Sequence, residues 1–241
     1  MEPRTYRHWI EGKDLIAFNV ILKETDLYIR ASTNLKRKAH RLVLKYRNLL
    51  EKYIERNPTF QTSLEPLPIP KDAPNIVKQM AEAAQKAGVG PMASVAGAIA
   101  ELVGIELLGF SPEIIVENGG DIYLKSLRKI VVGIYAGKSP LTGKIGMEIN
   151  GQDTPLGICT SSGTVGHSLS YGKADAVITL SRSAILADAA ATAIGNLVSQ
   201  PDDITRGIEF AKSIKELTGV VIIVDDNIGL YGDVKLCQTS T

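Results

Sequence analysis

The sequence predicts an α+β fold in which helices pack on one mostly antiparallel sheet. Strand patterns and helix patterns occur in blocks along the chain and not in strict βαβ alternation. Gly-rich turns separate the strand patterns between residues 113 and 160, and several of these strands are expected to be antiparallel neighbours. The 241 residues are 44% hydrophobic but only 5% aromatic, so the core must consist of aliphatic and small side chains.

The first sixty residues predict a hairpin followed by a long basic helix. Residues 15–22 and 27–31 are rich in β-forming residues, and a polar turn lies between them. Asn34 is a suitable N-cap for a helix that runs to Arg56. Residues 1–60 hold thirteen Lys and Arg against seven Asp and Glu, most of the excess being on this helix. Leucines give it an apolar face, which favours a packed helix with a solvated basic side over nucleic-acid binding.

The middle of the chain predicts a connector and two helices. Residues 60–74 hold most of the prolines of this region and are expected to be extended. Residues 76–87 form an amphipathic helix that ends at Gly88. Residues 92–108 are almost wholly apolar or small, so this helix is expected to be buried on all sides.

The second half of the chain predicts a series of strands, followed by two helices and a final hairpin. Strands are expected at 114–117, 121–125, 130–135, 145–149, 156–160 and 176–180. A helix follows at 184–198, a second helix at 204–217, and a final hairpin joins 220–224 to 228–231.

Composition excludes several classes of protein. The net charge of +1 is not that of a strongly basic or acidic chain. Cys159 and Cys237 share no metal-ligand spacing and fit reduced thiols. The N-terminal residues have no apolar signal-peptide region, and no stretch reaches the roughly 18 apolar residues of a membrane span. A cytoplasmic protein without a membrane partner is therefore expected.

Asp188 and Thr192 are the first candidate ligand pair. They lie four residues apart in the expected helix 184–198, so their side chains share one face, lined otherwise by alanines. A carboxylate and a hydroxyl are oxygen ligands of the kind that Mg²⁺ prefers. The alternative is an Asp that serves the helix dipole and a Thr that bonds back to a carbonyl. The spacing alone favours that alternative.

A turn between two expected strands is the second candidate. Its paired glycines can adopt positive φ, so that a ligand approaches the backbone and amide groups attract an anion. The residues are Asn118, Gly119, Gly120 and Asp121. The alternative is a plain hairpin turn, because Asn-Gly is a common turn dipeptide, and this motif alone is a weak signal.

A hydroxyl-rich loop is the third candidate. Its hydroxyls and its glycine suit a phosphate-binding loop, and the residues are Thr160, Ser161, Ser162 and Gly163. His167 follows closely and could act as a general acid or base. A structural histidine beside a polar loop is the alternative.

The segment 88–93 is the fourth candidate. Two glycines and a proline before a helix present free amides and the positive end of the helix dipole to an anion. No Lys follows as in a Walker A loop, and no strand comes just before it as in a dinucleotide-binding fingerprint.

In chain order, these segments resemble the motifs of the ApbE superfamily, the FAD:protein FMN transferases. That family carries an NAGGD turn, a TSG loop, a later histidine and an ADALSTA-type helix. The matching segments here are ENGGD (117–121), TSSG (160–163), His167 and ADAAATA (187–193). With VGPMASVAGAIAE at 89–101, the chain is similar to an uncharacterised cytoplasmic branch. The resemblance covers residues 75 to 200 by motif and implies one domain over 1–241 with a T-fold-related architecture.

The resemblance also implies a chemistry. Mg²⁺ would be held by Asp188, Thr192 and the backbone carbonyl of Ala93, beside FAD bound at the turn and the loop. His167 would be the catalytic residue. The metal and the amide donors would align and neutralise the pyrophosphate of FAD. FMN would then pass to a Thr or Ser hydroxyl of an acceptor protein.

Two departures from the family motifs support alternative functions. The family segment GGIAKG has a Lys where this chain has Ser94 or a neighbour, and the stretch between TSG and the family's HIIDP histidine is absent. These departures fit a flavin- or nucleotide-binding protein without the chemistry. A nucleic-acid-associated protein that uses the basic helix is a third, less favoured hypothesis. The small-residue helices leave a homo-oligomer open.

Overall fold

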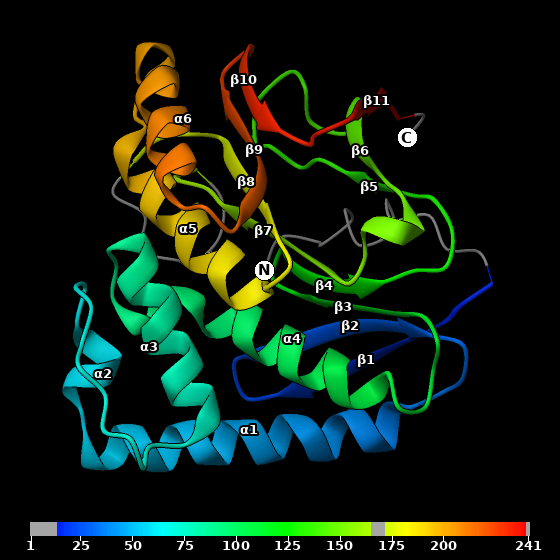
Figure 1. Ribbon diagram of the computed structural model, residues 1–241. Coiled ribbons are helices and arrows are strands. Elements are labelled where there is room, and N and C mark those ends of the chain that lie inside the picture. Colours follow the sequence, from blue (N-terminus) through cyan, green and yellow to red (C-terminus); the bar gives the residue numbers. More distant parts are fainter. Residues whose placement is uncertain (1–13, 165–171, 240–241) are drawn as a thin grey trace.

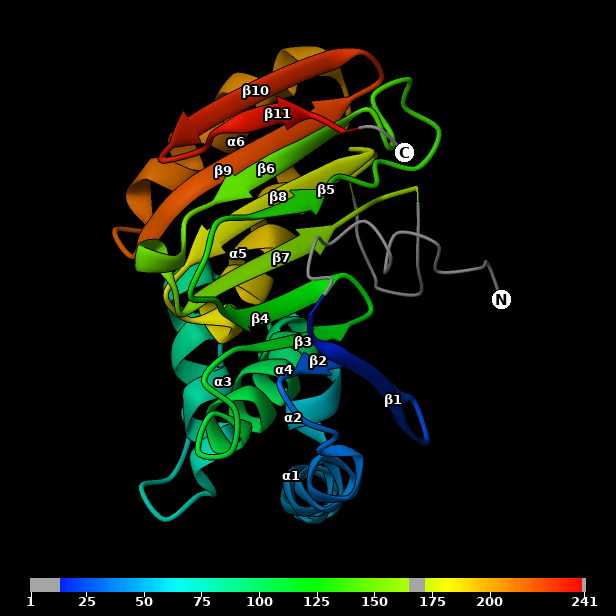
Figure 2. The ribbon, with the colours of Figure 1, turned by 90° about the vertical axis from the view of Figure 1, so that its right-hand side faces the viewer.

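The protein has three layers, which Figures 1 and 2 show from two directions. The computed structural model describes residues 14–164 and 172–239. Most helices lie on one face of an eight-stranded sheet, and a smaller three-stranded sheet lies on its other face. Figure 2 shows β5, β6 and β11 of the small sheet in front of the large one.

The strands of the large sheet are β1 (Ile16–Leu22), β2 (Thr25–Ala31), β3 (Ile114–Asn118), β4 (Asp121–Lys125), β7 (Leu156–Ser161), β8 (Ala176–Ser181), β9 (Leu217–Val224) and β10 (Asn227–Gly232). The small sheet holds β5 (Ile130–Gly133), β6 (Ile145–Ile149) and β11 (Leu236–Gln238). The α-helices are α1 (Lys36–Arg56), α2 (Thr59–Thr62), α3 (Asn75–Ala87), α4 (Val95–Leu107), α5 (Ala184–Leu197) and α6 (Ile204–Ser213). Three short 3₁₀ turns cover Pro91–Ser94, Gly151–Asp153 and Pro201–Asp203.

All described strand pairs are antiparallel, which confirms the predicted fold class. The order in the large sheet is β1-β2-β3-β4-β7-β8-β9-β10, and in the small sheet β11-β6-β5. The prediction of one sheet was wrong. The β5–β6 hairpin leaves the main sheet because its apolar side chains, among them Val132 and Met147, bury against the sheet's second face.

The two faces of the large sheet support two separate cores. The larger core joins α1, α3, α4 and α5 to the helix-bearing face. The smaller core fills the space between the two sheets with aliphatic side chains such as Ile158, Ile178 and Val221. Alternate residues of one strand enter opposite cores, so Ile158 faces the small sheet while Cys159 faces the helices.

Helix α1 runs along the edge of the helical layer, at the bottom of Figure 1. It buries Ala39, Val43, Tyr46 and Leu50, which recur at a helical spacing. Its basic side stays exposed, as predicted.

Some boundaries differ from the prediction. The helix expected over 92–108 is a 3₁₀ turn followed by α4, and it is not buried on all sides, because Ile105 is 48% exposed. The helix expected over 204–217 ends at Ser213, and Leu217 begins β9. The proline-rich connector includes α2, whose Phe60 is buried against the ring of Tyr53.

Two further expectations can be compared with the fold. Cys159 and Cys237 are both free thiols. Among the described residues, no single helix has the length and apolar composition needed to cross a membrane. The segments Asn75–Ala87 and Pro91–Leu107 meet that criterion only as a pair, and they are bent by 103° relative to each other.

Candidate functional site

Asp188 links the middle of α5 to the start of α4. Its Oδ2 accepts a hydrogen bond of 2.8 Å from the backbone N–H of Gly97, and the residue is only 9% exposed. The helices approach so closely here that a Cβ at Gly97 would lie 2.3 Å from the carbonyl oxygen of Ala184. Burial, and then the charge of Asp121, raise the pKa of Asp188 well above its ordinary value, while the N–H groups of Gly97 and Ala96 oppose that rise.

Asp121 is a second buried carboxylate, at the start of β4. Its Oδ1 accepts a hydrogen bond of 3.2 Å from the backbone N–H of Thr160, and the residue is 7% exposed. Burial raises the pKa of Asp121 to about 7, with a smaller contribution from Glu117. The N–H of Thr160 and the thiol of Cys159 act in the opposite direction.

No cation compensates these two carboxylates in the described part of the chain. The groups that shift the pKa values of Asp121 and Asp188 are amides, a thiol and other carboxylates, and no Lys or Arg is among them. Buried charges are normally paired with an opposite charge or bound to a metal. The place is therefore electrostatically suited to a bound cation.

The oxygen atoms near Asp188 are of the kind that bind a hard cation. Thr192 lies one helical turn further along α5 and is half-buried. Ala93 is also half-buried, in the 3₁₀ turn Pro91–Ser94 that packs against α5. No group of three or more His, Cys, Asp or Glu within 14–164 and 172–239 is arranged to hold a metal. A cation here would thus take the Asp188 carboxylate together with hydroxyl and carbonyl oxygens, as Mg²⁺ does.

The turn between β3 and β4 is hydrogen-bonded to the start of α4. Asn118 donates through Nδ2 to the carbonyl oxygen of Ala96, at 3.1 Å. Gly119 and Gly120 have φ of 69° and 109°, the positive values expected from their sequence. The N–H of Gly120 already donates to Glu117 Oε1 at 2.8 Å, so it is not a free donor for an anion.

The last residue of β7 carries a hydroxyl that has no partner among the described residues. Ser161 is 6% exposed, and its Oγ has no hydrogen-bond partner in the described structure. Such buried polar atoms are rare and call for an explanation, such as an absent ligand. Ser162 and Gly163 are engaged locally, because Ser162 Oγ accepts from the N–H of Thr164 and Gly163 donates to Ala174. His167 lies outside the described residues.

Ser94 lies in the segment where the family motif has a Lys at this residue or a neighbour. It is completely buried, and its Oγ donates to the carbonyl oxygen of Pro91 at 2.9 Å. Its hydroxyl is therefore committed to the 3₁₀ turn.

The structure adds a residue that the motifs did not identify. Glu101 of α4 is 8% exposed, and its Oε2 accepts from Ser183 Oγ at 2.9 Å and from the N–H of Ile185 at 3.0 Å. Burial raises the pKa of Glu101, and these donors oppose the rise. The signal in the sequence was a glutamate inside an otherwise apolar helix, at i+4 from Gly97.

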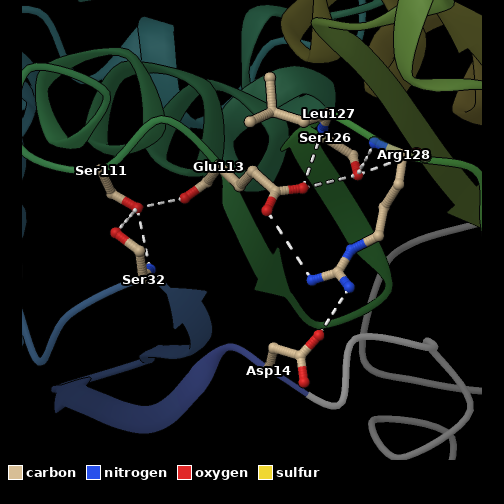
Figure 3. A network of polar contacts seen from close by, with 7 residues as sticks. All are labelled: Asp14, Ser32, Ser111, Glu113, Ser126, Leu127 and Arg128. Carbon is tan, nitrogen blue, oxygen red and sulfur yellow. Dashed lines mark hydrogen bonds and ion pairs between the residues drawn. The ribbon is translucent and has the colours of Figure 1, made fainter.

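A second polar network lies at the end of the β3–β4 hairpin that is away from its turn. Figure 3 shows it joining Asp14, Ser32, Ser111, Glu113, Ser126, Leu127 and Arg128. Glu113 Oε1 accepts from Ser126 Oγ at 3.1 Å and from the N–H of Leu127 at 2.8 Å. These bonds tie the β4–β5 connection to the residue before β3.

The candidate site therefore brings together four segments that are distant in the sequence. The start of α4, the 118–121 turn, the end of β7 and the middle of α5 meet through Asn118, Asp121, Thr160, Gly97 and Asp188. The contacts of Thr192 and Ala93 with any ligand, and the place of His167, stay predictions.

Comparisons with known proteins show the family and the fold of the chain. A family model described as "AbpE bacteria" matches residues 7–222. The UPF0280 protein MJ1526 of Methanocaldococcus jannaschii is 44% identical over 221 residues, covering 89% of this chain and 90% of the relative. A UPF0280 protein of Methanocella arvoryzae is 46% identical over 192 residues, covering 79% and 78%.

Solved structures share the fold at low sequence identity. The apo flavinyl transferase ApbE of Pseudomonas stutzeri has a TM-score of 0.61 at 13% identity, covering 90% of this chain and 94% of that one. The ApbE protein of Thermotoga maritima has a TM-score of 0.56 at 13% identity, covering 91% and 97%. At this identity the likeness concerns the fold alone.

Proposed function

Because the chain belongs to the family of the UPF0280 proteins and the bacterial AbpE model, with the fold of ApbE flavin transferases, we propose that it is a Mg²⁺-dependent enzyme acting on FAD or a related dinucleotide. One observation carries the proposal. Four segments converge on two buried carboxylates, Asp121 and Asp188, and no Lys or Arg within residues 14–164 and 172–239 compensates them. A divalent cation would neutralise them, and its remaining charge would attract a pyrophosphate.

Each residue at the site has a proposed role. Asp188, Thr192 and the carbonyl of Ala93 would hold Mg²⁺, which would supply positive charge to stabilise the pyrophosphate oxygens. The turn Asn118–Asp121 and the loop Thr160–Gly163 bind the dinucleotide. The Oγ of Ser161, which is buried and has no partner in the described part of the chain, would donate to an oxygen of this ligand.

The reaction cleaves the pyrophosphate bond of FAD. The bond between the FMN phosphorus and the bridging oxygen breaks, and AMP leaves with that oxygen. The FMN phosphorus forms a new bond to the oxygen of water or of a Ser or Thr hydroxyl of an acceptor protein. His167 accepts the proton of the attacking hydroxyl. A cytoplasmic location and a protein acceptor belong to the same proposal.

Turnover of FAD tests this proposal. Purified protein with FAD and MgCl₂ should form AMP together with free or protein-bound FMN, as measured by chromatography of the products. Asp188→Asn keeps the size of the side chain but removes the charge, so the rate should fall about 100-fold or more. Asp202→Asn changes an exposed aspartate in the 3₁₀ turn 201–203 and should leave the rate unchanged. Absence of turnover of any dinucleotide by the wild type would overturn the proposal.

The second candidate function is flavin or nucleotide binding without chemistry. The segment around Ser94 favours it, because Ser94 is buried with its hydroxyl committed to Pro91 and no Lys stands at this residue or its neighbours. Equilibrium dialysis distinguishes the two functions. FAD that is retained by the protein and recovered intact after incubation with Mg²⁺ supports this second function, whereas retention of no flavin and no adenine nucleotide eliminates it.

A further inference from the structure

The first turns of α1 carry a concentrated positive charge on one face. Arg37, Lys38, Arg41 and Lys45 fall within about 100° of the helix circumference at 3.6 residues per turn, so their side chains leave the helix on the same side. No Asp or Glu occurs between residues 27 and 50. Figures 1 and 2 both show α1 at the edge of the molecule, with the described elements on one side of it. Within the described part of the chain, this face is therefore open to a large partner.

Three of these four cations are not neutralised by an acidic side chain. Lys45 is paired with Glu106 at 2.7 Å. Arg37, Lys38 and Arg41 form no ion pair within residues 14–164 and 172–239. Arg37 and Arg41 are exposed, and Lys38 is half-buried. An anionic partner would have all three cations available for charge-assisted hydrogen bonds.

The placement of these cations destabilises the helix that carries them. The first turn of α1 holds Lys36, Arg37 and Lys38 but no acidic residue, although the positive end of the helix dipole favours acidic residues there. Arg37, Arg41 and Lys45 repeat at i, i+4, a spacing at which like charges destabilise a helix. A helix face that is only solvated would be more stable with mixed charges. Because such local rules are broken mainly at functional sites, the arrangement indicates an anionic partner.

An exposed aromatic ring lies beside the cations. Phe110 follows the end of α4 and is 55% exposed, and Lys38 Nζ lies 3.8 Å from the centre of its ring. An exposed ring among cations is a surface on which an unpaired base can stack while the cations contact neighbouring phosphates. Phe110 and the three cations without an ion pair (Arg37, Lys38 and Arg41) are termed the α1 surface. The fold, and not the helix alone, brings the ring and the charges together.

The geometry of the α1 surface distinguishes between anionic partners. A helix that binds a membrane inserts its apolar side, but the apolar side of α1, with Val43 and Leu50, is already buried in the protein core. An intact duplex keeps its bases stacked and offers none of them to Phe110. Arg37 and Arg41 are separated by about 6 Å along the helix axis, which suits successive phosphates of an extended strand. These features favour a single strand.

We propose that the α1 surface binds a single-stranded nucleic acid without regard to its sequence. The three cations contact phosphates, and Phe110 stacks on one base. The site goes beyond the proposed function, because α4 separates it from the Asp188 centre. Gly97, which contacts Asp188, lies near the start of α4, and Phe110 follows the end of that helix, about 15 Å further along its axis.

Fluorescence anisotropy of a labelled oligodeoxythymidine of about 12 nucleotides, titrated with the full chain, tests the proposal. Binding should be measurable at about 50 mM salt, and the logarithm of the binding constant should fall with that of the salt concentration with a slope of about −2, as three phosphate contacts on a single strand predict. Replacing two cations (Arg37→Ala, Arg41→Ala) should reduce the slope to about −0.7 and weaken binding about tenfold or more. Phe110→Ala should weaken binding about fivefold or more and leave the slope unchanged. Oligouridine of the same length should bind equally, because phosphates and base faces are common to DNA and RNA.

A matched pair of substitutions at the other end of α1 provides the control. Lys52→Ala with Arg56→Ala removes the same charge from exposed positions and should leave binding of the oligonucleotide unchanged. No binding, equal weakening by the two pairs of substitutions, or binding of a duplex as tight as that of the single strand and insensitive to Phe110→Ala would overturn the proposal. Vesicles of phosphatidylserine and phosphatidylcholine test the membrane alternative. Binding to these vesicles without binding to the oligonucleotide would overturn the proposal as well.

Discussion

At the scale of single residues, Asp188 and Glu101 form a reciprocal arrangement between two helices. Asp188 of α5 accepts from the N–H of Gly97 at the start of α4, and Glu101 of α4 accepts from the N–H of Ile185 at the start of α5. An anion at a helix start contributes about 0.3–2 kcal/mol. Burial of the charge opposes this contribution, which is why the pKa of each carboxylate is raised.

Glu101 should make the stability of the protein depend on pH. Because burial raises its pKa above the ordinary value of 4.5, the folded state binds more protons than the unfolded state above that pH. Its contribution to the free energy of unfolding is therefore fully present below pH 4.5 and is lost as pH rises through the folded-state pKa. Glu101→Gln has no proton to lose. Urea unfolding without metal should show that this variant gains stability relative to the wild type as pH rises from 4 to 8.

Glu106→Gln on the same helix provides the control. Lys45 lowers the pKa of Glu106 through a hydrogen bond of 2.7 Å, so the difference from the wild type should change with pH in the opposite direction and weakly, since the pair is exposed. A stability difference between Glu101→Gln and the wild type that is constant over the whole pH range would contradict the argument.

At the scale of elements, the crossing of α4 and α5 depends on Gly97. A methyl group at this position would lie 2.3 Å from the carbonyl oxygen of Ala184 and 2.8 Å from Asp188 Cβ, so the helices would have to move apart. Gly97→Ala should therefore destabilise the protein by about 1–3 kcal/mol in urea unfolding and displace the Asp188 carboxylate. Gly109→Ala, whose nearest neighbour would lie at 3.6 Å, should change stability by less than about 0.5 kcal/mol. Equal effects of the two substitutions would show that the helices do not need this close approach.

At the scale of the whole molecule, one sheet is shared by both cores. Met80 is buried in the core on the helical side, and Met147 in the core between the sheets. Met80→Ala and Met147→Ala should each cost about 2–5 kcal/mol and move the same single unfolding transition, followed by far-UV and near-UV circular dichroism. Two transitions, of which each variant moves only one, would show that the cores unfold independently and that the chain is not one cooperative domain.

The sequence by itself determined the fold class, most elements and the local conformation of the glycine turn. These features follow from periodicity and turn chemistry, which act over a few residues. The positive φ values of Gly119 and Gly120 and the end of α3 at Gly88 are of this kind. Motif order along the chain was enough to indicate the ApbE-like family.

Only the tertiary structure decided which distant segments of the chain are in contact. Whether β5 and β6 stay in the main sheet depends on which apolar surface they can cover, and that surface is built from strands far away in the sequence. The burial of Asp188 beside Asp121, and of Glu101 at the start of α5, likewise arises from contacts between segments that are many residues apart. Spacing within one helix could not show whether Asp188 is a metal ligand or a residue that interacts with the helix dipole. The difference depends on whether a Lys or Arg lies near the carboxylate, and in the described part of the chain that is decided by segments outside the helix.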